Sequence, residues 1–365
     1  IDGLGIKAGD NSYIIFRDQN SGLEYIRPVS ELGDRGLFLH LRAYTCIVFT
    51  DFRQVEDDSS HLYRQLCNML HGEGVPSITD SMREILLKSV LEPMGEILNT
   101  GYLNYLNNEI LKPSNNVEDV LKIKEEARIK MQHLVDGALC IYRSNVLIND
   151  IIDETARLIE LILVLSNKPA GKSTPGYEIK LKMSQSLQEN TGLRLAAVIY
   201  SYFAHIGKIV DPDDIRNSSI SLFDEWKAGR YIENTVSGLG LSQQDAIRVV
   251  KMVRVMISMQ KWIDDPACQD PAAFLKATLS NPDIQLLLQM NRYQDILWYS
   301  KEGFDDFISC LMASVVLEPD LTDPSVQYER ILVARQLLAT LLKASDNAGY
   351  QVEKLIQVLE EPEVQ

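Results

Sequence analysis

Residues 117–142 read VEDVLKIKEEARIKMQHLVDGALCIY, and this stretch decides the fold class. Its apolar residues recur at intervals of three and four, which is the spacing of one face of an amphipathic α-helix. Charged residues fill the positions between them. The pattern holds over about seven turns, so it predicts the longest helix of the chain.

Shorter segments repeat this helical spacing along most of the sequence. They cover residues 62–70, 78–92, 102–111, 151–162, 193–207, 242–262, 304–317 and 328–342. Pro93 is expected to kink or end the second of these helices. Asp or Asn precedes Pro at Asp211, Asp270, Asn281 and Asp323, which supplies an N-cap oxygen followed by a proline at the first helical position. These pairs predict the starts of short packed helices.

The first 55 residues have strand character instead. Residues 13–17 and 23–27 are joined by 18–22, whose residue types suit a hairpin loop, and alternating leucines in 37–41 and the run 44–53 are further candidate strands. A sheet this small buries too little area to be stable alone. We therefore expect it to pack on the downstream helices or on an upstream domain.

Length and pattern together predict a mainly α protein with a small N-terminal antiparallel β unit. At 365 residues the chain exceeds the size at which single cores stop growing, so two units are expected. We predict a β-rich unit at 1–55 and a helical domain at 56–365. Residues 167–177 contain several Pro and Gly residues and form a possible seam inside the helical domain.

Charge and cysteine content restrict the partners and the compartment. A net charge of −15 disfavours nucleic acid and anionic membranes, and no apolar run is long enough to span a bilayer, so a soluble protein is expected. Five widely spaced cysteines fit a reducing compartment, and we predict a cytoplasmic location. The chain opens at Ile1 with no signal peptide, and we expect it to be the downstream part of a longer polypeptide.

The common chemical motifs are incomplete. Gly171-Lys172-Ser173 imitates the end of a phosphate-binding loop, but Ser166 stands where the first glycine is required, which favours a plain flexible loop. The five histidines show no i, i+4 pair, and the acidic clusters lack the alternating oxygen ligands of a calcium loop. We predict no metal, no cofactor and no catalytic residue.

An aromatic stretch at residues 289–307 is the strongest candidate for a site. Tryptophan and tyrosine faces stack on sugar rings, and neighbouring polar groups can bond hydroxyls, as a carbohydrate or small-ligand pocket requires. In the alternative interpretation, Trp298 and Phe304 anchor a turn between helices and Arg292 pairs with a carboxylate inside the bundle. The candidate ligand-binding residues are Asn291, Arg292, Tyr293, Trp298, Tyr299, Lys301 and Glu302.

Several strings resemble large bacterial proteins of the α-amylase glycoside hydrolase family. The strings in the β-rich region that follows the family's barrel are 13–18 (YIIFRD), 23–27 (LEYIR), 36–44 (GLFLHLRAY) and 48–55 (VFTDFRQV). Those in its long helical extension are 71–77 (HGEGVPS) and 291–302 (NRYQDILWYSKE). The resemblance implies that the β unit is the remnant of a post-barrel β-sandwich. It also implies a parent protein of carbohydrate metabolism that acts on α-glucans.

The resemblance transfers no catalytic residue to this chain. The family's nucleophile motif is Gly-x-Arg-x-Asp, and the nearest string, residues 192–196, has alanine in place of the aspartate. We therefore expect a non-catalytic accessory region that docks on an upstream catalytic barrel of the same polypeptide, contacts α-glucan, and exposes an apolar patch between Ile14 and Phe52. The alternative is a helical protein-interaction module without a carbohydrate role. A third possibility is an enzyme whose site is assembled from scattered residues.

Overall fold

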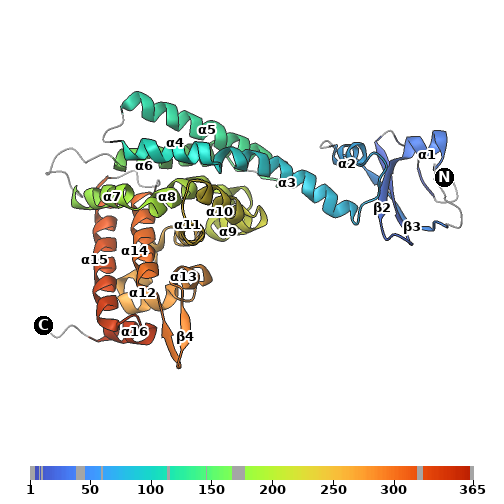
Figure 1. The fold of residues 1–365 in the computed structure, drawn as a ribbon. Coiled ribbons are helices and arrows are strands. Elements are labelled where there is room, and N and C mark those ends of the chain that lie inside the picture. Colours follow the sequence, from blue (N-terminus) through green and yellow to red (C-terminus); the bar gives the residue numbers. More distant parts are fainter. Residues whose placement is uncertain are drawn as a thin grey trace. The chain divides into compact units, whose positions relative to one another are not determined.

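A computed structural model describes residues 5–7, 9, 11–37, 46–58, 61–112, 116–144, 146–166, 177–318 and 324–361. The protein is mainly α-helical with a small antiparallel sheet near its N-terminus, which confirms the predicted fold class (Figure 1). It divides into two compact units, Ile1–Glu92 and Pro93–Gln365.

The first unit is built on three antiparallel strands in the order β2-β1-β3. These are β1 (Ser12–Asp18), β2 (Glu24–Pro28) and β3 (Phe49–Glu56), accompanied by helices α1 (Val29–Arg35) and α2 (Leu62–Leu70). The hairpin predicted for residues 13–27 is therefore present. Residues 38–45, which include most of the predicted 37–41 strand, lie outside the described part of the chain.

Alternate side chains of β1 enter two separate apolar clusters, because successive residues of a strand point to opposite faces. Tyr13 and Ile15 pack with Leu66 of α2 and with Ile78. Ile14 and Phe16 pack on the other face, with Val29 and half-buried aromatic neighbours. The first unit therefore extends into α2 and into α3 (Ile78–Ile97) as far as Glu92, whereas the β-rich unit was predicted to end at residue 55.

The expected exposed apolar patch on these strands is absent at Ile14 and Phe16. Both side chains are only 1% exposed. The short helix α1, which the sequence analysis did not anticipate, contacts β1 and β2 on this side, and Leu32 belongs to the cluster that buries them. Phe49 and Phe52 remain half-buried in the same cluster.

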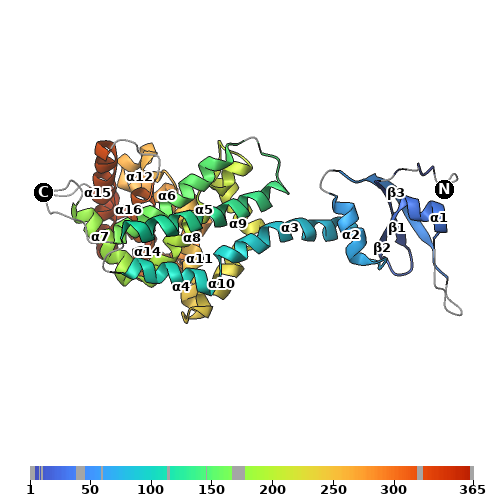
Figure 2. The same cartoon turned by 90° about the horizontal axis from the view of Figure 1, so that it is seen from above.

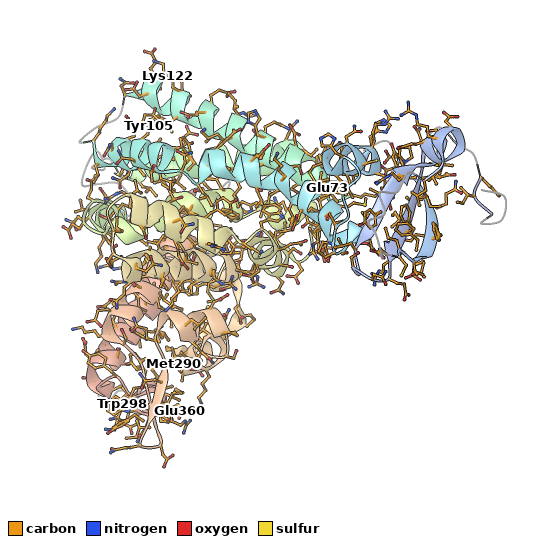
Figure 3. All side chains as sticks on the ribbon, turned by 45° about the vertical axis from the view of Figure 1, so that its right-hand side comes forward. Glu73, Tyr105, Lys122, Met290, Trp298 and Glu360 are labelled. Carbon is orange, nitrogen blue, oxygen red and sulfur yellow. The ribbon has the colours of Figure 1, made fainter. Side chains whose placement is uncertain are left out.

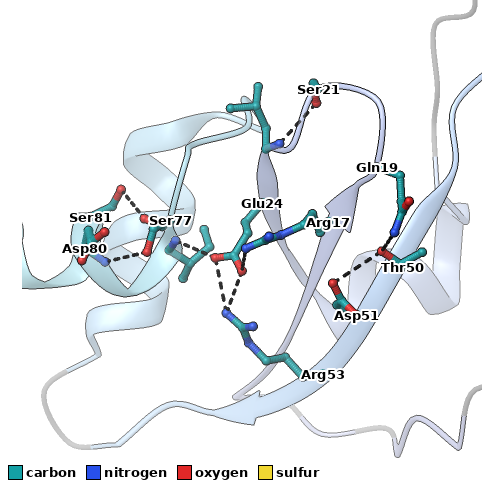
Figure 4. A network of polar contacts seen from close by, with 12 residues as sticks. Arg17, Gln19, Ser21, Glu24, Thr50, Asp51, Arg53, Ser77, Asp80 and Ser81 are labelled. Atoms are coloured by element: carbon teal, nitrogen blue, oxygen red, sulfur yellow. Dashed lines mark hydrogen bonds and ion pairs between the residues drawn. The ribbon is translucent and has the colours of Figure 1, made fainter.

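A buried carboxylate joins the strands to the start of α3 (Figure 4). Glu24 on β2 accepts a bond from the Ile78 amide at 2.8 Å and lies 3.3 Å from guanidinium nitrogens of Arg17 and of Arg53. Burial alone would raise the pKa of Glu24. The Ile78 amide and the two arginines more than offset this, and the pKa is lowered overall.

Helix α3 (Ile78–Ile97) begins in the first unit and contains Pro93. Ser77 accepts a bond from the Asp80 amide at 3.1 Å, as its cap-like position predicts. The helix continues past Pro93 for four residues, so of the two predicted effects of this proline the helix end is excluded and the kink stays a prediction.

The second unit is a bundle of helices with one small hairpin. It contains α4 (Thr100–Leu111), α5 (Val117–Leu139), α6 (Ile148–Ser166), α7 (Tyr177–Glu189), α8 (Thr191–Phe203), η2 (Ile206–Ile209), α9 (Ile215–Glu225), α10 (Ala228–Gly238), α11 (Gln243–Ser258), η3 (Trp262–Asp264), η4 (Pro266–Gln269), α12 (Pro271–Thr278), α13 (Pro282–Leu287), β4 (Asn291–Tyr293), β5 (Ile296–Trp298), α14 (Lys301–Val316), α15 (Pro324–Ala348) and α16 (Val352–Glu360). The possible seam at 167–177 falls almost wholly outside the described residues.

Helix α8 forms the centre of this bundle. Its residues from Leu193 to Phe203 are all buried, which is the pattern of a helix surrounded by others. It contacts α4, α6, α7, α11 and α14, and Figure 2 shows it among these helices from above. Arg194 is buried here and bonds neutral oxygens, including Asn107 Oδ1 at 2.7 Å.

Three of the four predicted Asp/Asn-Pro starts can be compared with the structure. Asp270 caps α12 and Asn281 caps α13, each followed by proline in the first turn, so these two are confirmed. Asp211 does not begin a helix, because its carboxylate bonds the amides of Asp213 and Asp214 and the latter caps α9. Helix α15 begins at Pro324, but residue 323 itself lies outside the described part.

Among the described residues, no helix combines the length and apolarity needed to cross a membrane.

Candidate ligand-binding sites

The predicted aromatic stretch folds into a β-hairpin followed by the start of α14. Strands β4 and β5 pair in antiparallel register through a two-residue turn of Gln294 and Asp295, whose φ angles are 49° and 62°. Positive φ at both positions is typical of a type I′ turn. This hairpin is not predictable from the sequence, because Gln-Asp is not one of the residue pairs that signal such a turn.

Cross-strand pairing sorts the candidate residues onto two faces of the hairpin. Asn291 lies opposite Trp298 and Tyr293 lies opposite Ile296, and directly opposite residues share a face. Four residues therefore make up one side, which we call the aromatic face: Asn291, Tyr293, Ile296 and Trp298. Arg292 points to the other side of the hairpin.

The aromatic face is partly open to solvent. Tyr293 is 64% exposed, Asn291 is exposed, and Trp298 is half-buried. The indole nitrogen of Trp298 is buried and has no hydrogen-bond partner among the residues that the structure describes. In Figure 3, Trp298 lies with Met290 and Glu360 at one end of the second unit, remote from Tyr105 and Lys122.

The base of the hairpin is fixed to the surrounding helices. Trp298 forms a β-bridge with Gln351, and the Tyr299 amide donates to the Tyr350 carbonyl at 3.0 Å. The Tyr299 hydroxyl lies 2.8 Å from Ser345 Oγ, and burial raises its pKa to about 12. Tyr299 is therefore a packing residue.

The remaining candidates lie elsewhere. Arg292 is exposed, and its guanidinium donates to the Asp295 carbonyl at 3.3 Å rather than to a carboxylate inside the bundle. Lys301 and Glu302 are exposed in the first turn of α14. Bonds from its own amide and from Ser300 hold the pKa of Glu302 below its usual value. The seven candidates therefore do not form one site. Asn291, Tyr293 and Trp298 lie on the aromatic face, and Arg292 lies on its reverse side. Tyr299 lies in the core, and Lys301 and Glu302 lie at the start of α14.

A second candidate site is an open cavity of about 290 Å³ beside α9. One side of α9 contributes Ser218, Ser221, Leu222 and Glu225 at helical spacing, with Asn217 next to them. Val210 and Tyr142 come from other segments and complete the lining.

Tyr142 and Glu225 are joined within this cavity. The Tyr142 hydroxyl donates to Glu225 Oε2 at 2.8 Å. Its ring packs on that of Trp226, with centroids 6.5 Å apart, and Trp226 is only 1% exposed. The buried indole thus supports the tyrosine ring from within the bundle. Sequence spacing could not link Tyr142 to α9, although the polar series on α9 is visible in the sequence.

A half-buried ionisable cluster of His205, Glu154 and Lys208 lies outside both sites. His205 Nδ1 is 3.6 Å from Glu154 Oε2, and Lys208 Nζ approaches the same carboxylate oxygen at 2.6 Å. No group of three or more His, Cys, Asp or Glu side chains in the described part is arranged to hold a metal ion. The imitated phosphate loop at Gly171 lies outside the described part of the chain.

Comparison with protein-family models, with curated proteins and with solved structures found no match.

Proposed function

We propose that this chain is a non-catalytic accessory region of an α-glucan-active protein, and that the aromatic face of the β4–β5 hairpin contacts the glucan. The observation that carries the proposal is the exposed Tyr293 ring on the same face as Trp298 and the Asn291 amide. Aromatic faces stack on sugar rings, and an amide both donates bonds to and accepts bonds from hydroxyls.

The rigid base of the hairpin favours this role. Because β5 is bonded to the segment before α16 and Tyr299 is bonded to Ser345, the aromatic face is held in place before a ligand arrives. Preorganisation of this kind reduces the entropy lost on binding. The resemblance to the α-amylase family suggests α-glucan as the ligand and the upstream catalytic barrel of the same polypeptide as a partner.

The five free cysteines are consistent with a reducing cytoplasm, where we place the protein.

Calorimetric titration of the chain with maltoheptaose tests this function. We expect binding by the wild type and a loss of about two- to thirteenfold in affinity for Tyr293→Ala, the effect of one aromatic contact. Arg292→Ala is the matched control, because it lies on the reverse side of the same hairpin and should bind as the wild type does. Absence of heat with the wild type, or equal losses in both variants, would exclude glucan binding by this face.

The second candidate function is a helical protein-interaction module. It is favoured by apolar side chains on the outside of α5, where Val117 is 76%, Leu121 53% and Ile129 49% exposed. Their spacing of four and eight residues places them along one side of the helix. A partner protein captured by the wild type but not by Leu121→Asp, together with no glucan binding, would support this function over the first.

A further inference from the structure

The lining of the α9 cavity contains one ionisable acid and no basic side chain. Glu225 supplies the carboxylate, and Tyr142 holds it through the 2.8 Å bond from its hydroxyl. A tyrosine ring beside a carboxylate attracts organic cations, because both the face of the ring and the acid are negative. The lining therefore opposes anionic ligands and favours cationic ones.

The loop that leads into α9 adds to this negative field. Val210 lines the cavity and is followed by Asp211, Asp213 and Asp214, all of which are exposed. Exposed carboxylates that directly follow a lining residue in the chain raise the local concentration of cations near it and the rate at which they arrive.

Neutral oxygens complete the cavity. Ser218 and Ser221 line it, and a serine hydroxyl can accept a bond from a ligand N–H or O–H. The Asn217 side-chain nitrogen donates to Asp214 Oδ2 at 2.8 Å, and the amide oxygen of this lining residue is a further acceptor.

The size of the cavity restricts the ligand further. Its volume of about 290 Å³ is at the lower limit of the ~300–1,000 Å³ typical of small-molecule pockets. A peptide or a long polyamine would extend well beyond it. We propose that the cavity binds a small organic ammonium ion, with its cationic group against the Tyr142 ring and near the Glu225 carboxylate. This site is independent of the hairpin and of its proposed glucan contact.

Titration of the full chain with choline and tetramethylammonium at low ionic strength tests the site. We expect Glu225→Gln to weaken choline binding about two- to fivefold, since it removes the charge and keeps an oxygen for the Tyr142 hydroxyl. Tyr142→Leu should weaken it by a similar factor by removing the ring. Added salt should weaken binding to the wild type more than to Glu225→Gln.

Glu118→Gln is the control for a general change of charge. Glu118 is exposed at the start of α5, whereas Tyr142 follows the end of that helix, roughly 30 Å away at 1.5 Å per residue. Its choline affinity should equal that of the wild type. The proposal is overturned if the wild type binds no choline at millimolar concentrations, if Glu225→Gln and Glu118→Gln behave alike, or if maltose or phosphate displaces choline.

Discussion

Replacing Glu24 by alanine should loosen the first unit selectively. The Glu24 side chain is 6% exposed, and it accepts the bond from the Ile78 amide at the buried start of α3. Without that acceptor the amide is buried and unsatisfied, which costs about 1–3 kcal/mol. The pairs with Arg17 and Arg53 add about 0–1 kcal/mol each, since both arginine side chains are more than 40% exposed.

The expected total is about 1–5 kcal/mol, or roughly a 5- to 5,000-fold change in an opening equilibrium. Amide hydrogen exchange of peptides covering β1 measures this change directly. It is preferable to tryptophan fluorescence, because all three tryptophans, Trp226, Trp262 and Trp298, belong to the second unit.

Two further variants define the mechanism. Glu24→Gln keeps an oxygen for the Ile78 amide and should lose only about 1 kcal/mol, the charge-assisted part of the contacts. Glu73→Gln removes the same charge from an exposed position of the same unit and should change exchange less than twofold. If exchange of β1 in Glu24→Ala matches that of Glu73→Gln, the carboxylate does not hold the strands to α3.

Three other predictions concern packing and charge. A Cβ at Gly303 would lie 2.5 Å from a backbone oxygen, so Gly303→Ala should destabilise the second unit by about 1–3 kcal/mol in urea unfolding followed by tryptophan fluorescence. Gly95 also lies in a helix, but a Cβ there would have no atom within 4 Å, so Gly95→Ala should stabilise the protein by about 0.5–1 kcal/mol. A change of the same sign in the free energy of unfolding for both variants would contradict this reasoning. Arg248→Met should lower the free energy of unfolding by about 3–5 kcal/mol, because it leaves Asp306, which is 2% exposed, as an unpaired buried carboxylate. The double variant that also carries Asp306→Leu should regain most of this stability. The pKa of Glu24 is lowered in the folded protein, so its contribution to the free energy of unfolding should be complete above the ordinary pKa of 4.5. This contribution should disappear as the pH falls through the folded pKa. Circular dichroism between pH 6 and pH 3 should show this acid sensitivity in the wild type and not in Glu24→Gln.

The helical architecture could be predicted because its signals are local. The spacing of apolar residues in 117–142 located α5, although this helix has 23 residues and is not the longest as predicted, since α15 has 25. The Asp270 and Asn281 caps located α12 and α13. Asp211 has the same sequence signal, but its carboxylate is bonded within the preceding turn and Asp214 caps α9 instead. Two possible capping residues three positions apart compete, and the sequence does not decide between them.

The candidate sites were less predictable because they depend on pairing and packing. The aromatic stretch was recognised by composition, but only the strand register shows that Tyr293 and Trp298 share a face while Arg292 does not. The α9 cavity needs Tyr142, which is more than seventy residues from α9 in the sequence and reaches Glu225 only through the packing of the bundle.

Hydrogen exchange of the chain with and without maltoheptaose tests the central claim most directly. The account predicts slower exchange in the peptides that cover residues 289–300, and two- to thirteenfold more sugar should be needed for the same slowing in Tyr293→Ala. Slower exchange only in other segments, or none with saturating sugar, would contradict the assignment of the hairpin as the glucan-contacting element.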